Sequence, residues 1–242
     1  MLLSIQADGE IRIMHTIAKI PFFKDVADID FPKFDRRVTW KRCDPEETVV
    51  DFEDPTSDVY FLLSGEMRVL IRTVSGREII LAELRSGEFF GELSAIDGVH
   101  RSANVTALTK SEMCIMPGAV FRELVFTSRV ACHQVLRQLT GRVREMNARL
   151  TEHSIFDLKH RLYSELLRLS HERADHPGQR VISPPPFHHV LSARIGCRRE
   201  QVTRELSVLT HDGIIEKSRG GMILKKPKVL KDRLEEAMSE DG

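Results

Sequence analysis

The first half of the chain has apolar residues at the short intervals that are typical of β-strands. From residue 38 to residue 116, runs rich in Val, Ile and Phe are separated by Gly65, Gly76, Gly87, Gly91 and Gly98. In one run Met67, Val69 and Ile71 alternate with residues of the opposite face, as in a strand with one buried face. The glycines stand where tight turns are needed. The pattern therefore predicts antiparallel strands that close into an all-β barrel.

The pattern changes after Pro117, where glycine and proline become rare. Apolar residues then recur at a 4-3-4-3-4 spacing, at Cys132, Leu136, Leu139, Val143, Met146 and Leu150. This spacing is typical of a coiled-coil seam, and it predicts a long dimerisation helix over about residues 118–155. An amphipathic helix that packs on its own domain gives a similar pattern over so few heptads, so both interpretations stay open.

The last third of the chain predicts further helices and a hairpin. A helix over 157–170 is followed by the polar, proline-containing segment 171–186, which we expect to be an exposed loop. Residues 187–195 and the run after Gly196 have apolar residues at helical spacing, and a Gly-rich hairpin follows over 213–224. Helix, glycine turn, helix and hairpin together predict a winged helix-turn-helix. The apolar positions of its two helices are Val190, Leu191, Ile195, Val202, Leu206 and Leu209.

Length and composition are those of a two-domain protein. The 242 residues, 41% hydrophobic and 30% charged, divide into domains predicted over 1–156 and 157–242, with a short helix or a frayed tail over 225–242. No apolar run approaches the length of a membrane span and the N-terminus lacks the apolar stretch of a signal peptide, so we expect a cytoplasmic protein without membrane contact. The four cysteines form no CxxC pair, and we expect neither a metal site nor a disulfide framework.

Charge is unevenly distributed although the formal net charge is zero. Residues 157–228 hold 14 Lys or Arg against 8 Asp or Glu, whereas residues 1–156 hold 20 against 23. A basic C-terminal part beside a slightly acidic first part indicates contact with nucleic acid at the C-terminal end.

The segment 90–105 carries the chemistry of a sugar-phosphate site. Glu92 and Arg101 stand nine residues apart around a turn rich in small residues. A guanidinium presents a rigid set of donors that matches two phosphate oxygens, and a carboxylate accepts a hydrogen bond from a ribose hydroxyl. Gly91 allows close approach of the backbone. As bare chemistry, a surface Glu–Arg pair at a hairpin would explain the same residues.

The amino-acid sequence of this segment resembles the phosphate-binding cassette of cyclic-nucleotide-binding domains. These domains occur in the bacterial cyclic-AMP receptor protein and in the regulatory subunits of cyclic-AMP-dependent kinase. The resemblance implies that Glu92 binds the ribose 2′-hydroxyl, that Arg101 pairs with the cyclic phosphate and that Ser102 adds a hydroxyl contact. The other cassette positions that it implies for the pocket are Gly91, Leu93, Ser94 and Ala103.

The purine contacts of the family fall on Met146 and Asn147, counted back from Asp157. Here the sequence departs from the family pattern, because Met146 cannot donate a hydrogen bond. The amide of Asn147 both donates and accepts, so it suits adenine or guanine. The resemblance therefore implies cyclic AMP as the allosteric effector, with cyclic GMP as the alternative that the Ser102 hydroxyl would assist.

The segment 195–204 resembles the recognition element of the same superfamily, that of the cyclic-AMP receptor protein and the fumarate–nitrate regulator. The resemblance implies that Arg199, Glu200 and Arg204 read the major groove at GTGA-like half-sites, because arginine matches guanine and glutamate accepts from cytosine. Thr203 shares their outward face. The residues that we expect to contact phosphates without reading sequence are His188, Arg198, Ser218 and Arg219.

The resemblance covers about residues 20–226 and implies the whole architecture. This is an α+β chain: a jelly-roll-like antiparallel β-roll that binds a cyclic nucleotide, a long dimerisation helix and a C-terminal winged helix-turn-helix. It implies a bacterial transcriptional regulator, not an enzyme, with no catalytic residues. The implied partners are a second copy of the chain, palindromic double-stranded DNA and RNA polymerase. The alternatives are a same-fold regulator that responds to haem or redox state, and DNA binding that is independent of nucleotide.

Overall fold

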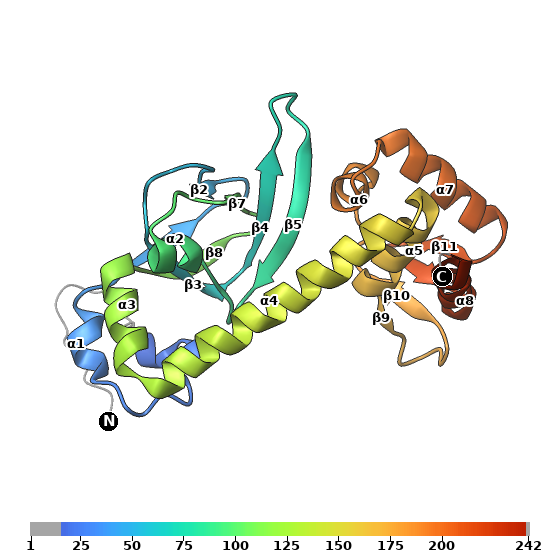
Figure 1. The fold of residues 1–242 in the computed structure, drawn as a ribbon. Coiled ribbons are helices and arrows are strands. Elements are labelled where there is room, and N and C mark those ends of the chain that lie inside the picture. The colour runs from blue at the N-terminus through green and yellow to red at the C-terminus, as the bar shows by residue number, and fades with distance from the viewer. Residues whose placement is uncertain (1–15, 241–242) are drawn as a thin grey trace. The chain divides into compact units, whose positions relative to one another are not determined.

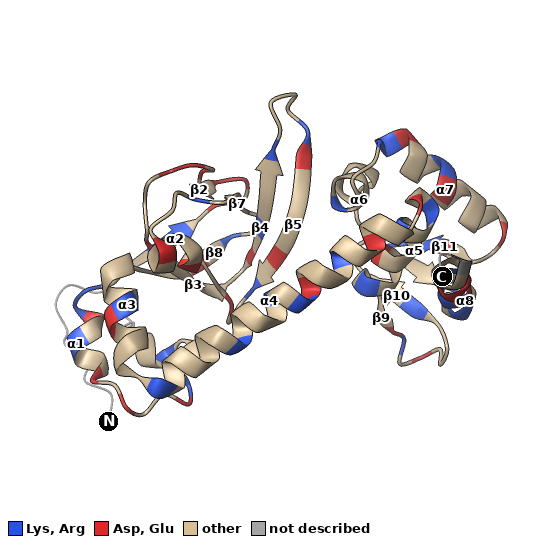
Figure 2. Cartoon of the chain, viewed as in Figure 1, with Lys and Arg blue, Asp and Glu red and all other residues tan. Residues whose placement is uncertain are grey.

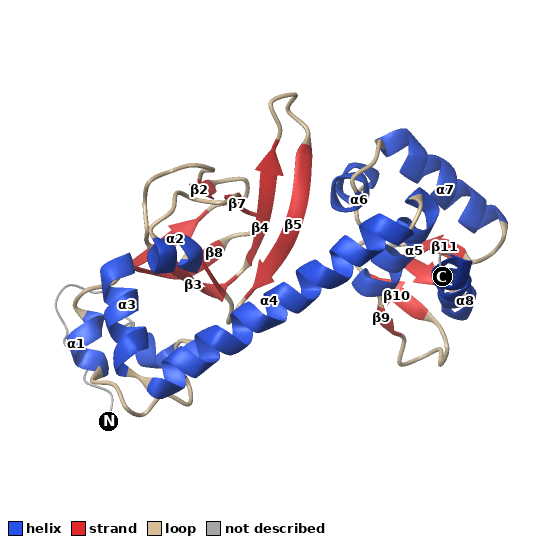
Figure 3. Cartoon of the chain, in the orientation of Figure 1, coloured by secondary structure: helices blue, strands red, loops and turns tan. Residues whose placement is uncertain are grey.

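The computed structural model describes residues 16–240, and Figure 1 shows their fold. The chain divides into two compact units. The first consists of residues up to 71 together with 82–139, and the second of residues 72–81 together with 140–242. Strands dominate the first unit and helices the second (Figure 3). The predicted domain boundary at 156/157 stays a prediction, and the segment 1–15 of the predicted first domain lies outside the described residues.

Two antiparallel four-stranded sheets form the β-roll, in the orders β1-β8-β3-β6 and β2-β7-β4-β5. Their strands are β1 (Thr39–Cys43), β2 (Thr48–Val50), β3 (Val59–Ser64), β4 (Glu66–Arg72), β5 (Glu78–Arg85), β6 (Phe89–Phe90), β7 (Asn104–Ala107) and β8 (Ser111–Met116). The helical elements beside them are η1 (Ile17–Lys19), η2 (Pro21–Phe23), α1 (Phe31–Asp35), α2 (Glu92–Asp97) and α3 (Gly118–Thr127).

The core of the β-roll is centred on β3. Its residues Val59, Tyr60, Phe61 and Leu62 are all buried, which identifies a strand that is covered on both faces. In β4, Met67 and Leu70 are buried while Val69 is half-buried, so the simple alternation predicted for this strand is only partly present. A single glycine fixes the turn between these strands. Gly65 has φ of +88°, and an added Cβ would lie 2.6 Å from the carbonyl oxygen of Lys110, so no side chain fits.

The helix expected over about 118–155 is divided in the structure into α3 and α4 (Arg129–Ile155). Ser128 stands between them in an extended conformation. Its hydroxyl donates to Asp28 at 2.6 Å and accepts from the amide nitrogen of Ala131 at 3.0 Å. A serine that accepts a hydrogen bond from the first turn is an N-cap, so it starts a new helix at this point.

The apolar seam of α4 meets two environments. Ala131 and Val135 are buried in the core of the first unit, and the partly buried Cys132 and Leu139 pack against that core. Further along, the helix carries apolar side chains that are more than half exposed: Leu136, Val143, Met146 and Leu150. Packing on its own domain therefore holds for the first positions of the seam, and the coiled-coil interpretation of the others stays a prediction. The start of α4 packs on its own unit, while the later positions leave an uncovered apolar stripe.

The second unit packs helices around a four-stranded antiparallel sheet of order β11-β12-β10-β9. Its elements are α5 (Leu158–Leu169), β9 (His171–Glu172), β10 (Arg180–Ile182), α6 (His188–Ile195), α7 (Arg199–His211), β11 (Ile215–Ser218), β12 (Gly221–Leu224) and α8 (Pro227–Glu240). All six apolar positions predicted for the helix-turn-helix are buried. The expected loop 171–186 contains β9 and β10, because β10 pairs with β12. Among residues 16–240, no helix is long and apolar enough to span a membrane.

Candidate functional site

Gly91 and Glu92 open the cassette between β6 and α2. Gly91 has φ of +83°, and an added Cβ would lie 2.6 Å from the carbonyl oxygen of Asp58 and 2.8 Å from Nη1 of Arg101. Only glycine fits this close approach. Glu92, the first residue of α2, is 2% exposed although it is a carboxylate. On the same short helix Ser94 is buried, whereas Leu93 is 47% exposed.

Arg101 is buried and held by three hydrogen bonds. Its Nε donates to Thr56 Oγ1 at 3.0 Å, Nη1 to the carbonyl oxygen of Gly91 at 2.9 Å, and Nη2 to that of Asp58 at 2.8 Å. The guanidinium also lies over the ring of Tyr60, 5.7 Å from its centroid. All three acceptors are neutral, so these bonds fix the direction of the guanidinium without neutralising its charge. A buried cation that is positioned in this way is suited to an anionic ligand.

Thr56 and Asp58 were not found by sequence reasoning. They belong to the loop between β2 and β3, which lies beside the cassette because Arg101 donates its backbone N–H to Asp54 and accepts from the N–H of Glu53. No spacing in the sequence signals these contacts between distant segments. Of the remaining cassette positions, Ser102 is exposed and Ala103 is buried.

Met146 and Asn147 lie on α4, within the second unit. Both side chains are exposed, that of Met146 to 68%. They are not part of the cassette of the first unit, which consists of Gly91, Glu92, Ser94 and Arg101 with their neighbours. Their contact with the purine stays a prediction.

The predicted recognition residues share the exposed face of α7. Val202 and Leu206 are buried, whereas Arg199, Glu200, Thr203 and Arg204 are exposed. Basic and acidic side chains both occur along this helix (Figure 2). The turn before α7 depends on Gly196, the C-cap of α6, with φ of +70°. Arg198 precedes the helix, and its backbone N–H donates to Gln201 Oε1 at 3.0 Å.

The predicted phosphate contacts lie on the elements next to α7. His188 is the first residue of α6, and its Nδ1 lies 2.7 Å from Thr203 Oγ1. Ser218 ends β11, and its hydroxyl donates to the carbonyl oxygen of Gly221 at 3.2 Å. Arg219 is exposed in the turn of this wing. The arrangement therefore brings His188 and Thr203 together, while Ser218 and Arg219 form a separate tip.

Ion pairs fix the helix-turn-helix on α5 and on the end of α4. Glu165 and Arg194 join α5 to α6 at 3.0 Å, with side chains 2% and 6% exposed. Arg168 bonds both Glu165 and, at 2.6 Å, Glu152 of α4. Loss of either partner of the buried pair Glu165–Arg194 would leave an uncompensated buried charge. The partly exposed pair Arg168–Glu152 binds the last turns of α4 to α5 of the second unit.

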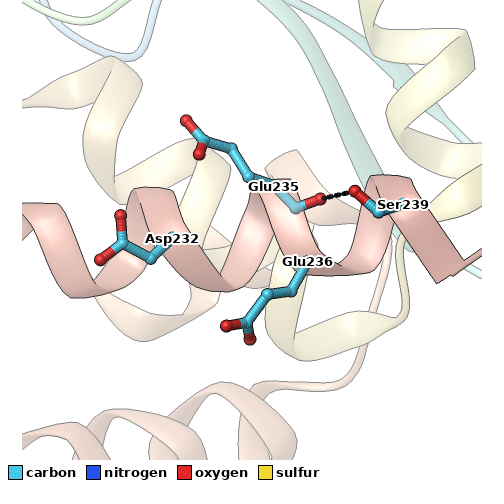
Figure 4. Close-up of a pocket in the computed structure, with 4 residues that line it drawn as sticks. All are labelled: Asp232, Glu235, Glu236 and Ser239. Atoms are coloured by element: carbon cyan, nitrogen blue, oxygen red, sulfur yellow. Dashed lines mark hydrogen bonds between the residues drawn. The ribbon is translucent and has the colours of Figure 1, made fainter.

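A surface hollow of about 450 Å³ lies on α8, lined by Asp232, Glu235, Glu236 and Ser239. Figure 4 shows the three carboxylates along α8, with the hydroxyl of Ser239 donating to the carbonyl oxygen of Glu235. These carboxylates would repel a cyclic phosphate or DNA, so the hollow fits neither predicted ligand. Among the described residues, no group of His, Cys, Asp and Glu is placed to hold a metal ion.

Two family models match separate segments of the chain. The cyclic nucleotide-binding domain matches residues 40–128, and the Crp-like helix-turn-helix domain matches residues 160–233. The match to the first contains the whole cassette, and the match to the second contains α6, α7 and the wing.

Curated relatives span most of the chain. The cyclic AMP receptor protein of Thermus thermophilus is 29% identical over 181 residues, which cover 72% of this chain and 78% of that protein. The cAMP-activated global transcriptional regulator Vfr of Pseudomonas aeruginosa is 28% identical, over 72% of this chain and 84% of its own. Among solved structures, the c-di-GMP responsive global regulator CLP of Xanthomonas campestris has the same fold, with a TM-score of 0.67 at 22% identity over 78% of this chain and 94% of its own.

Proposed function

Because the chain belongs to the superfamily of the cyclic-AMP receptor protein and the fumarate–nitrate regulators, we propose that a cyclic nucleotide controls its binding to DNA. The chain is a transcriptional regulator with a cyclic nucleotide-binding domain and a DNA-binding helix-turn-helix, and it is not an enzyme. The observation that carries the proposal is Arg101, a buried cation whose side chain is held by three neutral acceptors.

The proposed effector is cyclic AMP, with cyclic GMP as the alternative. Arg101 would pair with the cyclic phosphate and the buried Glu92 with the ribose 2′-hydroxyl, both of which the two nucleotides share. The choice of base falls to Ser102, Met146 and Asn147. Relatives that are named cAMP-activated favour cyclic AMP, while the Asn147 amide suits either purine.

Calorimetric titration of the purified protein tests this proposal. We expect heat of binding with cyclic AMP, and the loss of at least an order of magnitude in affinity in Arg101→Gln, because a charge-assisted pair with phosphate contributes about 2 kcal/mol or more. Arg85→Gln is the matched control, since Arg85 is 80% exposed. Cyclic GMP and c-di-GMP are titrated for comparison. We include c-di-GMP because the name of CLP, a protein with the same fold, describes it as c-di-GMP responsive.

The titration also separates the alternatives. Absence of heat with all three nucleotides would overturn the role of the cassette. A purified protein with a Soret absorption band would point instead to haem.

The proposed DNA target is a palindrome. A homodimer paired along the exposed stripe of α4 would present two copies of α7, with Arg199, Glu200 and Arg204 of each on a GTGA-like half-site. RNA polymerase is the further partner that we propose for a regulator of this family, and the cytoplasm is its place of action. A gel-shift assay on a GTGA palindrome without nucleotide, with cyclic AMP and with cyclic GMP tests both effector and target. Equal binding in all three lanes would show DNA binding that is independent of nucleotide.

A further inference from the structure

Two helices of the DNA-binding unit meet at the side chain of His188. The residue begins α6, and its Nδ1 lies 2.7 Å from the hydroxyl oxygen of Thr203 on α7. Lys217 of β11 and Arg199 of α7 are near enough to act on the ring electrostatically. Thr203 lies on the exposed face that we assign to DNA, so the imidazole stands at the edge of that face.

The hydrogen bonds of Thr203 determine which nitrogen of the ring carries hydrogen. Its hydroxyl donates to the carbonyl oxygen of Arg199 at 3.1 Å. A hydroxyl has one hydrogen, so while this bond is formed Thr203 accepts from His188, and Nδ1 of the neutral ring is the donor. The other nitrogen, Nε2, is then unprotonated. A proton added at Nε2 leaves the bond between His188 and Thr203 intact.

The surroundings of His188 keep the ring neutral in the free protein. Partial burial, first, and then the positive charges of Lys217 and Arg199 lower the pKa of His188 below its usual value. Both charged groups that act on the ring are cations, and both lie on elements that the winged helix-turn-helix places toward DNA. A phosphate of the DNA backbone at this place would offset these charges and favour the imidazolium.

We propose that His188 takes up a proton at Nε2 when the protein binds DNA, and that the imidazolium then contacts a backbone phosphate, so that affinity for DNA rises on acidification. The inference rests on the proposed function, because it needs DNA against this face. The pKa of the ring is higher in the complex than in the free protein. The added affinity is therefore complete below the pKa of the free protein and is lost as the pH rises through the pKa of the complex.

The proposed contact is independent of DNA sequence. A phosphate has the same charge beside every base pair, so the gain on acidification should be equal on the palindrome and on random DNA. This distinguishes His188 from Arg199, which is predicted to read a base.

The test measures the affinity of the full-length protein for both DNAs by fluorescence anisotropy, at saturating effector and fixed ionic strength, from about pH 8 to about pH 5.5. In His188→Asn an amide still reaches Thr203 but takes up no proton. His189→Asn is the matched control, since His189 is the next residue, exposed, and stacked on Phe187. On acidification, we expect the affinity of the wild type and of His189→Asn for DNA to rise more than that of His188→Asn. The difference should be about tenfold per protomer for each unit by which DNA raises the pKa of His188.

Two further measurements make the outcome decisive. Calorimetry of DNA binding in two buffers of different ionisation enthalpy should show proton uptake by the wild type that His188→Asn lacks. His188→Lys, which carries a permanent charge, should bind at high pH about as tightly as the wild type does at low pH. Thermal unfolding of each variant checks that the unit that contains His188 is folded.

The same pH dependence in the wild type and in His188→Asn would overturn the inference while leaving the proposed function in place. A wild-type protein that binds neither DNA at any pH would overturn the proposed function, and the inference with it.

Discussion

At the scale of single residues, the cassette depends on a glycine that admits two neighbours at once. The carbonyl oxygen of Asp58 and the guanidinium of Arg101 both approach the place where a Cβ at residue 91 would stand. The same guanidinium donates to the carbonyl oxygen of Gly91 itself. The backbone at this position therefore directs the guanidinium of Arg101 as well as making room for it.

Replacing Gly91 with Ala should reduce both stability and affinity for nucleotide. The positive φ and the clash at 2.6 Å with a backbone oxygen should lower the free energy of unfolding by about 1–3 kcal/mol, and displacement of Arg101 should weaken nucleotide binding. Gly98→Ala is a matched control, because Gly98 also has positive φ but has nothing within 4 Å of its Cβ position. Denaturant unfolding and calorimetry measure the two effects. Equal nucleotide affinity in both variants would contradict the role of Gly91.

Arg198 and Arg199, at the start of α7, are predicted to make two different kinds of DNA contact, and Arg199→Ala tests this difference. We expect the variant to lose about 1–3 kcal/mol of binding free energy on the palindrome and little on random DNA, because an arginine that pairs with guanine discriminates between bases. Arg198→Ala should weaken binding to both DNAs alike. Anisotropy titrations at one salt concentration give the comparison. An equal loss on the two DNAs in Arg199→Ala would contradict base reading.

At the scale of elements, the environment of the side chains of α4 changes along the length of the helix. It begins at the Ser128 cap with Ala131 and Val135 in the core of the first unit. It ends with Glu152 bonded to Arg168 of α5. Between these fixed ends lies the exposed apolar stripe, which a single chain leaves in water. Burial of such a stripe against a second copy would remove that cost.

Leu150→Glu should convert the proposed dimer into a monomer. Leu150 is 67% exposed and continues the stripe, and two carboxylates facing each other across a coiled-coil seam repel. Met238→Glu on α8 is the control, since Met238 is 55% exposed and lies off the stripe. Analytical ultracentrifugation measures the mass of each. A dimer that survives Leu150→Glu unchanged would place the interface elsewhere.

At the scale of the whole molecule, regulation requires that nucleotide and DNA affect each other. A cyclic nucleotide strengthens DNA binding only if it binds the DNA-competent state better than the other state. The bonded end of α4 makes the last turns of this helix part of the DNA-binding unit, so a nucleotide that contacts Met146 or Asn147 would act on that unit directly.

Thermodynamic reciprocity gives a test of this coupling. Saturating nucleotide should increase the affinity for the palindrome by a factor that is typically about 5–150. The saturating palindrome must increase the affinity for nucleotide by the same factor. Both factors are measured on the same preparation, by anisotropy and by calorimetry. In Arg101→Gln we expect the nucleotide concentration that is needed to tighten the palindrome to rise by at least an order of magnitude. An unchanged nucleotide concentration in this variant would contradict the role of Arg101 in the coupling.

Local patterns in the sequence determined most of the elements and the candidate residues. The period of apolar residues and the glycine at a turn act within a few positions, so the strands of the β-roll, the two helices around Gly196 and the wing could be predicted from the sequence, whereas β9 and β10 could not. The cassette could be identified because its motif also lies within one short segment of the sequence.

Only the tertiary structure decided which distant groups meet. Thr56 and Asp58 reach Arg101 from 45 and 43 residues away, and His188 reaches Thr203 across the helix-turn-helix. The break of the long helix at Ser128 likewise depends on Asp28, a hundred residues earlier. The physical reason is the same in each case. A hydrogen bond between distant segments forms only after strand pairing and core packing have brought its two groups together, and no local pattern in the sequence encodes that distance.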